Sequence, residues 1–218
     1  MPHSFFITAT DTDAGKTWVT SHLITALQQQ NIRAKTLKPV ACGVACDGIN
    51  EDVTKLMRLQ NIEEPQTINL YNFAQPAAPS IAAETEQRTI EPEHLKQWCQ
   101  QKIKQHDITL IEGIGGLMVP LTPTYLVSDW LTDLPDAEVI LVVGAKLGCI
   151  NHALLTLHQL ASQKRSPACI IINDTTGKQD LDGLQSAISP FLTAGTTLLT
   201  CGYQQPESLI SWWKNIIV

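Results

Sequence analysis

A candidate ligand-binding motif lies near the start of the sequence, in the stretch FFITATDTDAGKTWVT from Phe5 to Thr20. An apolar run leads into small polar residues, then into Gly15-Lys16-Thr17, then into an amphipathic segment. A strand, a tight loop and a helix in this order are typical of a phosphate-binding loop, because the helix start attracts an anion. Gly15 allows close approach of the backbone, Lys16 brings positive charge to the β- and γ-phosphates, and the Thr17 hydroxyl suits Mg²⁺. The stretch therefore predicts a nucleotide site.

The spacing of this loop differs from the standard G-x-x-x-x-G-K-[ST], which requires a glycine where Thr10 stands. The preceding residue, Ala9, is not glycine either. One alternative is that Asp11-Thr12-Asp13 simply caps a helix. Capping and phosphate binding are compatible, so this alternative does not exclude a nucleotide.

Two acidic residues could complete a metal site with Thr17. Glu112 ends the apolar run ITLIEG, and an acid at the carboxyl end of a buried parallel strand points into the crevice where ligands bind. Asp52 opens a helix in GINEDVTKL. The alternatives are an exposed strand-end carboxylate for Glu112 and, for Asp52, an acid that favours the helix dipole. Together with Thr17 they would form the oxygen-rich site that Mg²⁺ prefers.

Lys38 is a further cation near the end of the second apolar run, directly before Pro39. Burying an unpaired ammonium costs several kcal/mol, of the order known for buried ions, whereas a phosphate partner would explain it. The alternative is a strand-end lysine whose ammonium reaches solvent.

A second distinctive stretch is AKLGCINHALLT, residues 145–156. Gly148 and Cys149 precede a helix that we expect to begin near Asn151. Free N–H groups at that helix start could hold a small carboxylate. The alternative is an ordinary glycine turn with Asn151 as the N-cap, and His152 is expected on the helix face rather than as a ligand or base.

Short apolar runs alternate with helical patterns along the chain, and these strands and helices are expected to carry the candidate site residues. Strands are predicted at 4–9, 33–40, 108–113, 139–144, 168–173 and 196–201, and helices at 16–30, 91–105, 151–163, 179–189 and 206–217. In the first helix the apolar residues Val19, Leu23, Ala26 and Leu27 share one face. Continuously apolar strands indicate burial on both faces of a parallel sheet. We therefore expect one doubly wound α/β domain over residues 1–218, with loops in 41–89 over one end of the sheet.

Composition excludes several classes of protein. The net charge of −6 lacks the basic footprint of a nucleic-acid binder. Six cysteines form no C-x-x-C pair, so zinc is not expected, and reduced thiols favour the cytoplasm. The longest apolar run, at 139–145, is far too short to span a membrane, and the first ten residues lack the pattern of a secretory signal.

Taken together, these motifs resemble those of dethiobiotin synthetases, the ATP-dependent enzymes late in biotin synthesis. The family's loop, G-T-D-T-x-V-G-K-T, is similar to residues 9–17 here, and its extra residue places the missing glycine at Ala9. Its K-P-V-A-S-G resembles residues 38–43, and its E-G-A-G-G resembles residues 112–116. Its V-V-G-x-K-L-G-C-I-N-H-A appears intact at 142–153, and an N-D pair matches residues 173–174.

The resemblance implies a P-loop NTPase-like fold and a homodimer with active sites at the interface. It implies that 7,8-diaminononanoate, CO2 and ATP react with Mg²⁺, by way of a carbamate that ATP phosphorylates before the second amine closes the ring. Lys16, Lys38 and Thr12 would act in catalysis. ATP would be held by Asp13, Ala14, Gly15, Lys16, Thr17, Trp18, Asp52, Glu112, Gly113, Gly115, Asn173 and Asp174.

Within that set, the resemblance implies that Asn173 reads adenine and that Thr17, Asp52 and Glu112 hold Mg²⁺. The substrate would contact Thr12 and Cys42 of one subunit. It would also contact a segment of the other subunit that comprises Leu147, Gly148, Cys149, Ile150 and Asn151.

Three departures from the family pattern leave an alternative function open. Ala9 replaces a glycine and would crowd the loop if that residue needs positive φ. Cys42 replaces a serine with a weaker hydrogen-bond donor. After residue 175 only Gly202 and Pro206 remain of an expected G-E-I-P-like segment. The alternative is a non-catalytic nucleotide-binding relative with a decayed site.

Two other classes fit less well. Partitioning ATPases place an extra lysine early in the loop, where this chain has Ala9, Thr10 and Asp11. Amidotransferase-type relatives carry an additional glutaminase domain, for which 218 residues leave no room.

Overall fold

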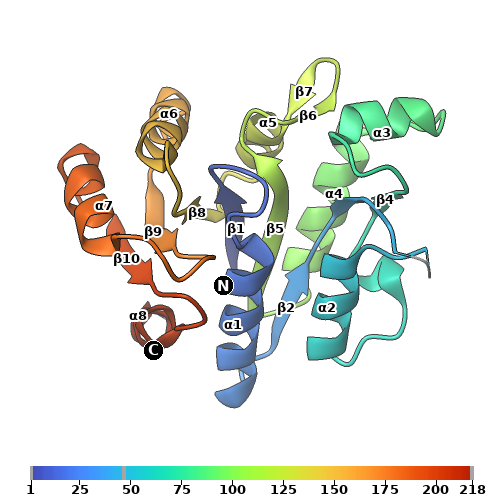
Figure 1. The fold of residues 1–218 in the computed structure, drawn as a ribbon. Helices are drawn as coiled ribbons and strands as arrows, with labels where there is room; N and C mark the ends of the chain where they lie inside the picture. The colour runs from blue at the N-terminus through green and yellow to red at the C-terminus, as the bar shows by residue number, and fades with distance from the viewer. Residues whose placement is uncertain (1, 46–47, 217–218) are drawn as a thin grey trace.

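Six parallel strands form the central sheet of the computed structural model, which describes residues 2–45 and 48–216 (Figure 1). Their order across the sheet is β10-β9-β8-β1-β5-β2, and every pairing among them is parallel. This confirms the predicted doubly wound α/β fold. The strands are β1 (His3–Ala9), β2 (Ala34–Leu37), β5 (Ile108–Gly116), β8 (Glu138–Gly144), β9 (Pro167–Asn173) and β10 (Thr197–Cys201).

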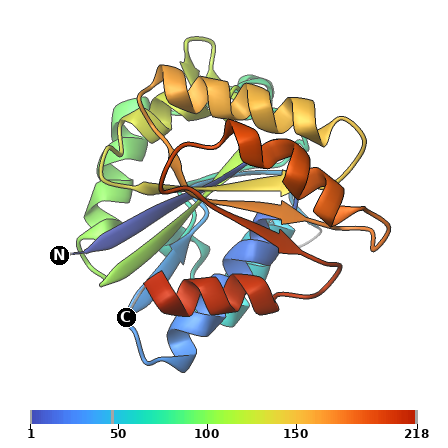
Figure 2. The same cartoon turned by 90° about the vertical axis from the view of Figure 1, so that its left-hand side faces the viewer.

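Helices cover both faces of this sheet, as Figure 2 shows. On one face lie α1 (Lys16–Gln29) and α8 (Glu207–Ile216), and on the other lie α4 (Pro92–Ile103), α5 (Val127–Thr132), α6 (Cys149–Ser162) and α7 (Leu181–Ile188). The four residues expected on the buried face of α1 are all buried. Among the described residues, no helix is long and apolar enough to cross a membrane.

The two aromatic residues of β1 show why the strands are apolar throughout. Successive side chains of a strand point to opposite faces, so Phe5 and Phe6 enter different layers. Phe5 meets Trp213 of α8 edge-on with ring centroids 4.8 Å apart, and Phe6 meets Trp130 of α5 at 4.9 Å. Burial on both faces anchors β1 at the centre of the sheet.

Residues 33–40 do not form one continuous strand, contrary to the sequence prediction. β2 ends at Leu37, and after Lys38-Pro39 the chain turns into β3 (Val40–Cys42), which pairs with β4 (Tyr71–Phe73) in a separate small sheet. Proline has no N–H for a ladder and restricts the residue before it, which accounts for the break.

The region 41–89, expected to contain loops and a helix opened by Asp52, contains that helix and further regular elements. They are α2 (Glu51–Leu59), the 3-10 turn Pro65–Thr67, β4 and α3 (Pro79–Thr85). A small antiparallel pair, β6 (Pro120–Thr122) and β7 (Tyr125–Leu126), follows β5. The elements other than α2 are too short to produce a clear hydrophobic period in the sequence.

Candidate active site

The phosphate loop occupies the connection from β1 to α1 at the carboxyl edge of the sheet. The chain leaves β1 at Ala9 and enters α1 at Lys16. β1 lies between β5 and β8, where connections run toward opposite sides of the sheet, and such switch points form ligand crevices in doubly wound folds. Ala9 is not among the described residues with positive φ, and it still pairs with Val142 in the sheet. Its Cβ therefore does not strain the loop.

The start of α1 is left open for an anion. No side chain of the described residues caps this helix, so the alternative of Asp11-Thr12-Asp13 as a helix cap is wrong. The Oδ1 atom of Asp11 accepts instead from the N–H of its neighbour Thr12, at 2.8 Å. The orphan N–H groups of the first helical turn and the helix dipole therefore remain available to phosphate.

Gly15 meets two independent requirements of this loop. Its φ of 96° lies in the left-handed region that side chains disfavour. A Cβ on this residue would also overlap Nδ2 of Asn173, so the Asn173 side chain would have to move. Position 15 thus requires glycine for its backbone conformation, and a side chain there would also disturb Asn173.

Lys16 is a buried cation, and no carboxylate of the described residues forms an ion pair with it. Its side chain is almost enclosed, and its ammonium donates a long hydrogen bond of 3.4 Å to the carbonyl oxygen of Asp11. Burial, followed by the charge of Lys38, lowers the pKa of Lys16 to about 8. A phosphate placed at the helix start would supply the missing negative charge.

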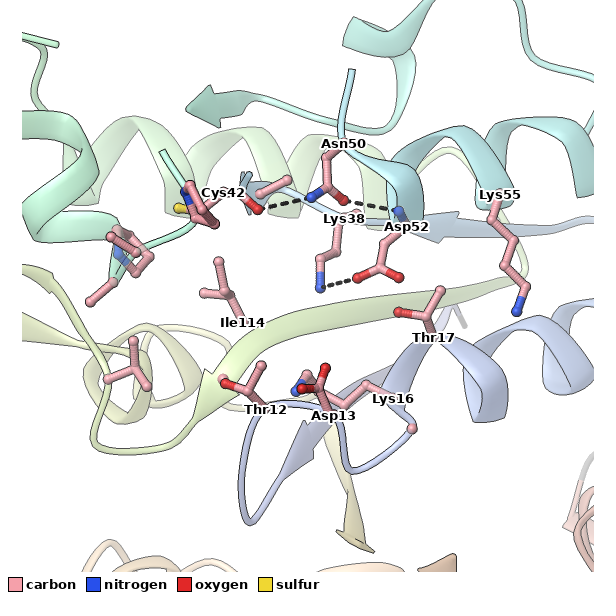
Figure 3. Close-up of a pocket in the computed structure, with 18 of the residues that line it drawn as sticks. Thr12, Asp13, Lys16, Thr17, Lys38, Cys42, Asn50, Asp52, Lys55 and Ile114 are labelled. Atoms are coloured by element: carbon pink, nitrogen blue, oxygen red, sulfur yellow. Dashed lines mark hydrogen bonds and ion pairs between the residues drawn. The ribbon is translucent and has the colours of Figure 1, made fainter. Parts of the chain in front are cut away.

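Lys38, Thr17 and Glu112 meet in a buried cluster on the other side of the helix start. The ammonium of Lys38 lies 2.8 Å from Oε1 of Glu112 and 2.9 Å from the carbonyl oxygen of Gly113. The Thr17 hydroxyl donates to the same Oε1 at 2.6 Å. Asp52 of α2 faces the cluster across the cavity, with Oδ2 3.9 Å from the Lys38 ammonium (Figure 3). The ammonium of Lys38 is therefore buried and paired, and it does not reach solvent.

The donor set of this cluster fits a magnesium ion. Glu112 is fully buried, and its Oε2 atom has no hydrogen-bond partner within the described chain. Two carboxylates and one hydroxyl are the hard oxygen ligands that Mg²⁺ accepts, with water and phosphate oxygens in its other positions. Among the described residues, no group of three or more His, Cys, Asp or Glu side chains could hold a metal ion. The cluster thus supplies oxygen ligands from Thr17, Asp52 and Glu112, and phosphate oxygens could complete the coordination of the ion.

A cavity of about 680 Å³ joins the loop to this cluster. Its polar end is formed by the loop and α2, and its more apolar end by Ile114, Val119 and the turn 76–79. Figure 3 shows the labelled side chains converging on this space from both sides. Its lining includes the predicted site residues Thr12, Asp13, Gly15, Lys16, Thr17, Trp18, Lys38, Cys42, Asp52 and Gly115.

Cys42 lies at the apolar end of the cavity as a neutral thiol. Burial raises its pKa to about 11, a shift that the nearby charge of Lys38 opposes. A neutral thiol is a weak hydrogen-bond donor and a good apolar contact. Cys46 lies outside the described residues, so its relation to Cys42 is not described.

Two predicted nucleotide residues lie beside the loop instead of lining the cavity. Nδ2 of Asn173 donates to the carbonyl oxygen of Ala14 at 3.0 Å, and this hydrogen bond links the end of β9 to the loop. Asp174 organises the turn that follows, accepting from the backbone of Thr176, Gly177 and Gln179. Burial raises the pKa of Asp174, but these hydrogen bonds outweigh it and hold the pKa below its usual value.

The segment 147–151 does not reach the cavity of its own chain. α6 begins at Cys149, two residues earlier than expected, after Gly148 as N-cap with φ of 90°. Asn151 is thus inside the helix, and the alternative of Asn151 as N-cap is wrong. Leu147 is fully exposed, while Cys149 is buried.

Sequence reasoning missed several residues that line the cavity. Asn50 caps α2 through the N–H groups of Asp52 and Val53, and its Nδ2 donates to the carbonyl oxygens of Cys42 and Gly43. Its position directly before an acidic first turn is a recognisable N-cap signal. The others are Ala41, Lys55, Pro76, Ala77, Ala78, Pro79, Ile114 and Val119, whose approach depends on the path of α2, β5 and the turn before α3.

A parallel sheet, an open helix start and a buried lysine beside it define a P-loop nucleotide-binding fold. Solved structures agree on the fold. The hydrogenase maturation factor HypB of Archaeoglobus fulgidus superposes with a TM-score of 0.62 at 12% identity, covering 99% of this chain and 90% of that one. A ParA family ATPase of Chlorobium tepidum TLS gives 0.56 at 14% identity, covering 98% of both chains.

Sequence comparison identifies the family within that fold. A family model described as an AAA domain matches residues 3–198. The ATP-dependent dethiobiotin synthetase BioD 1 of Escherichia coli K12 is 37% identical over 180 residues, which cover 81% of this chain and 80% of that protein. The BioD of Aeromonas salmonicida is 37% identical over 204 residues, 88% of this chain and 89% of that one. The BioD 1 of Salmonella typhi is 41% identical over 160 residues, 72% and 70% respectively. This chain belongs to the ATP-dependent dethiobiotin synthetase family.

Proposed function

We propose that this protein closes the ureido ring of dethiobiotin from 7,8-diaminononanoate and CO2, converting ATP to ADP and phosphate. One amine of the substrate adds to CO2 and forms a carbamate. A carbamate oxygen then attacks the γ-phosphorus, and ADP leaves. The second amine attacks the carbonyl carbon of the carbamoyl phosphate, and phosphate departs with the former carbamate oxygen. Membership of the family supports the overall reaction.

The observation that carries this proposal is the pair of buried lysines beside one cavity. Lys16 and Lys38 both line it, and both side chains are nearly excluded from solvent. A loose phosphoryl transition state needs positioning and positive charge more than it needs a strong base. Lys16 would stabilise the phosphoryl oxygens, and Lys38, with Thr12 opposite it, would stabilise the carbamate.

The proposed Mg²⁺ site is the cluster of side chains around Glu112. Thr17, Asp52 and Glu112 would hold Mg²⁺ together with phosphate oxygens. When bound, the ion would neutralise charge on the transferred phosphoryl group. The partnerless Oε2 of Glu112 supports this role.

ATP would lie along the start of α1. Residues 13–18 would surround the phosphates, with Gly113 and Gly115 of β5 at the γ-phosphate end. Asn173 and Asp174 lie on the opposite side of the loop, at the end of β9, and this position supports a role for Asn173 in contacting adenine.

The substrate would occupy the apolar end of the cavity, with Cys42 against its chain. Its carboxylate would meet residues 147–151 of a second copy in a homodimer. Two features support this part. These residues do not line the cavity of their own chain, and Leu147 is fully exposed at the start of the segment. The expected cytoplasmic location stays a prediction.

The test is dethiobiotin formation by the purified protein given 7,8-diaminononanoate, bicarbonate and MgATP, with ADP followed in parallel. Equal amounts of dethiobiotin and ADP, both lost in Lys16→Ala, are the expected result. MgATP binding without dethiobiotin would overturn the enzyme and favour a nucleotide-binding relative with a decayed site.

A further inference from the structure

One residue of the phosphate loop carries a charge that does not suit an anion site. Asp11 places a carboxylate within the loop, where it would repel phosphate. Its Oδ2 atom lies 2.5 Å from the ammonium of Lys146, which stands in the connection from β8 to α6. Lys146 does not line the cavity and has no part in the reaction as described above.

Asp11 in turn connects to the buried lysine. Its Oδ1 accepts from the N–H of Thr12, and its carbonyl oxygen accepts from the ammonium of Lys16. Both carboxylate oxygens of Asp11 thus have a partner, and its backbone carbonyl oxygen accepts from the Lys16 ammonium. A chain of contacts runs from Lys146 through Asp11 to Lys16.

The remaining contacts at this junction show that the loop rests on the end of β8. The N–H of Thr10 donates to the carbonyl oxygen of Val142 at 3.0 Å. Gly144 approaches Ala14 so closely that a Cβ on Gly144 would lie 2.9 Å from the Ala14 Cα. Lys146 follows this support by two residues and adds a charged contact at the tip of the loop.

The pair contributes little to folding. Its side chains are 50% and 41% exposed, and exposed ion pairs typically add less than about 1 kcal/mol. The hydrogen bond from Lys146 holds the pKa of Asp11 below its usual value, so this carboxylate is charged at neutral pH. A weak pair placed between a loop and its neighbouring element can orient the loop without stabilising the fold.

We propose that Lys146 is a positioning residue which, through Asp11, holds the phosphate loop and the Lys16 ammonium in the arrangement that receives nucleotide phosphates. This rests on the nucleotide site of the proposed function. It does not require that dethiobiotin is the product.

The experiment compares Lys146→Gln, Asp11→Asn, the double variant and Lys146→Arg by equilibrium binding of MgATP and by KM and kcat. We expect each single variant to weaken MgATP binding about tenfold, and the double variant to bind MgATP about as weakly as either single variant. Lys146→Arg should restore most of the affinity, because it keeps the ion pair. The effect should appear mainly in the KM for ATP.

A matched control is the exposed pair Arg33–Asp107, at 3.1 Å with side chains 68% and 61% exposed, which joins the residues before β2 and β5. Arg33→Gln should leave MgATP affinity unchanged. All five variants should melt within about 2 °C of the parent.

Two results would overturn the proposal. If the double variant regains parental affinity, Lys146 merely cancels the charge of Asp11 and positions nothing. If Lys146→Gln behaves as Arg33→Gln does, the contact has no role. A parent protein that binds MgATP but makes no dethiobiotin would refute the proposed reaction while leaving this comparison valid.

Discussion

Individual side chains of this site carry buried charges that a bound anion would pair with. Lys16 is buried and has a depressed pKa, whereas Lys38 shares Glu112 with Thr17. Buried charges that lack complete partners cost stability, and they are found where function needs them. The protonation of Lys16 should therefore affect both nucleotide binding and the free energy of unfolding as the pH changes.

Affinity for MgATP should fall as the pH rises above 8. The pKa of Lys16 in the free protein is about 8, so the ammonium that attracts phosphate is progressively lost above that pH. We expect the dissociation constant to rise by up to about tenfold per pH unit. Equilibrium binding between pH 7 and 9.5 measures this. Lys16→Met should bind weakly and show no such rise, and a parent affinity that stays flat over this range would contradict the assignment.

The same pKa predicts an opposite trend for folding of the nucleotide-free protein. An unfolded lysine titrates near 10.5, so between about pH 8 and 10.5 the unfolded chain holds a proton that the folded chain has released. The free energy of unfolding contributed by Lys16 therefore rises with pH across this window. Lys16→Met should be more stable than the parent at pH 7 by about 1–3 kcal/mol, and the difference should shrink toward pH 10. Urea unfolding at several pH values measures it, and a variant less stable than the parent at pH 7 would refute the prediction.

Cys42 should react slowly with alkylating reagents at neutral pH. With a pKa of about 11, its thiolate is scarce near pH 7.5. The rate should be about a hundredfold below that of an ordinary thiol and should rise with pH up to that value. Peptide mapping after iodoacetamide distinguishes Cys42 from the other cysteines, and Cys42→Ser is the control. Rapid modification of Cys42 at pH 7 would contradict the assignment.

At the scale of elements, the site depends on how each helix begins. α1 has no side-chain cap among the described residues and keeps its N–H groups for an anion, whereas α2 is capped by Asn50. The cap holds Asp52 at the first turn of α2, facing Lys38 across the cavity. A helix start can therefore serve either as a binding site or as a support for a ligand residue.

Asn50→Ala should change both stability and metal requirement. Loss of an N-cap costs about 1 kcal/mol, and the links from Asn50 to the carbonyl oxygens of Cys42 and Gly43 are lost as well. We expect the Mg²⁺ concentration for half-maximal activity to rise about threefold to tenfold, because Asp52 is less well held.

Asp180→Ala is the matched control for that change. Asp180 caps α7 through the N–H of Gly183, and neither lines the cavity. This variant should lose similar stability without any change in Mg²⁺ requirement. Chemical denaturation and activity titrations measure both properties, and an equal shift in the two variants would show that general destabilisation is the cause.

At the scale of the whole molecule, the proposed phosphate site is formed by one chain, whereas the segment proposed to meet the substrate carboxylate does not line the cavity of that chain. Residues 147–151 lead into α6 and form its first turn, and they do not line the cavity of the chain to which they belong. Exposed Met118 and Leu155 border a hollow of about 320 Å³ behind Thr10, Asp11 and Thr12. An apolar surface of this kind next to a site suits association with a second copy.

Mixing two inactive variants should restore activity if the active sites span two subunits. Asn151→Asp adds a negative charge in the first turn of α6, which the helix tolerates but a substrate carboxylate does not. Lys16→Ala removes the phosphate lysine. Co-folded mixtures should recover about a quarter of the parental activity, because half of the dimers are hybrid and each has one intact site. Recovery no greater than the sum of the separate variants would place the complete site within one chain.

The parallel sheet, the phosphate loop and the residue types of the site follow from local patterns in the sequence. Apolar runs and the spacing of Gly15, Lys16 and Thr17 are local properties, and the sheet and the loop can be predicted from them. Short elements such as α3 and α5 could not be predicted, because a single turn or two gives no clear period.

Which of these residues meet depends on the folding of the whole chain. Folding pairs Lys38 with Glu112, 74 positions away, and Asp11 with Lys146, 135 positions away. Ala9 belongs to the extended strand β1, and α6 begins at Cys149. Asn173 donates a hydrogen bond to the loop at Ala14. Such contacts depend on strand order and on the path of each connection, which no local pattern in the sequence specifies.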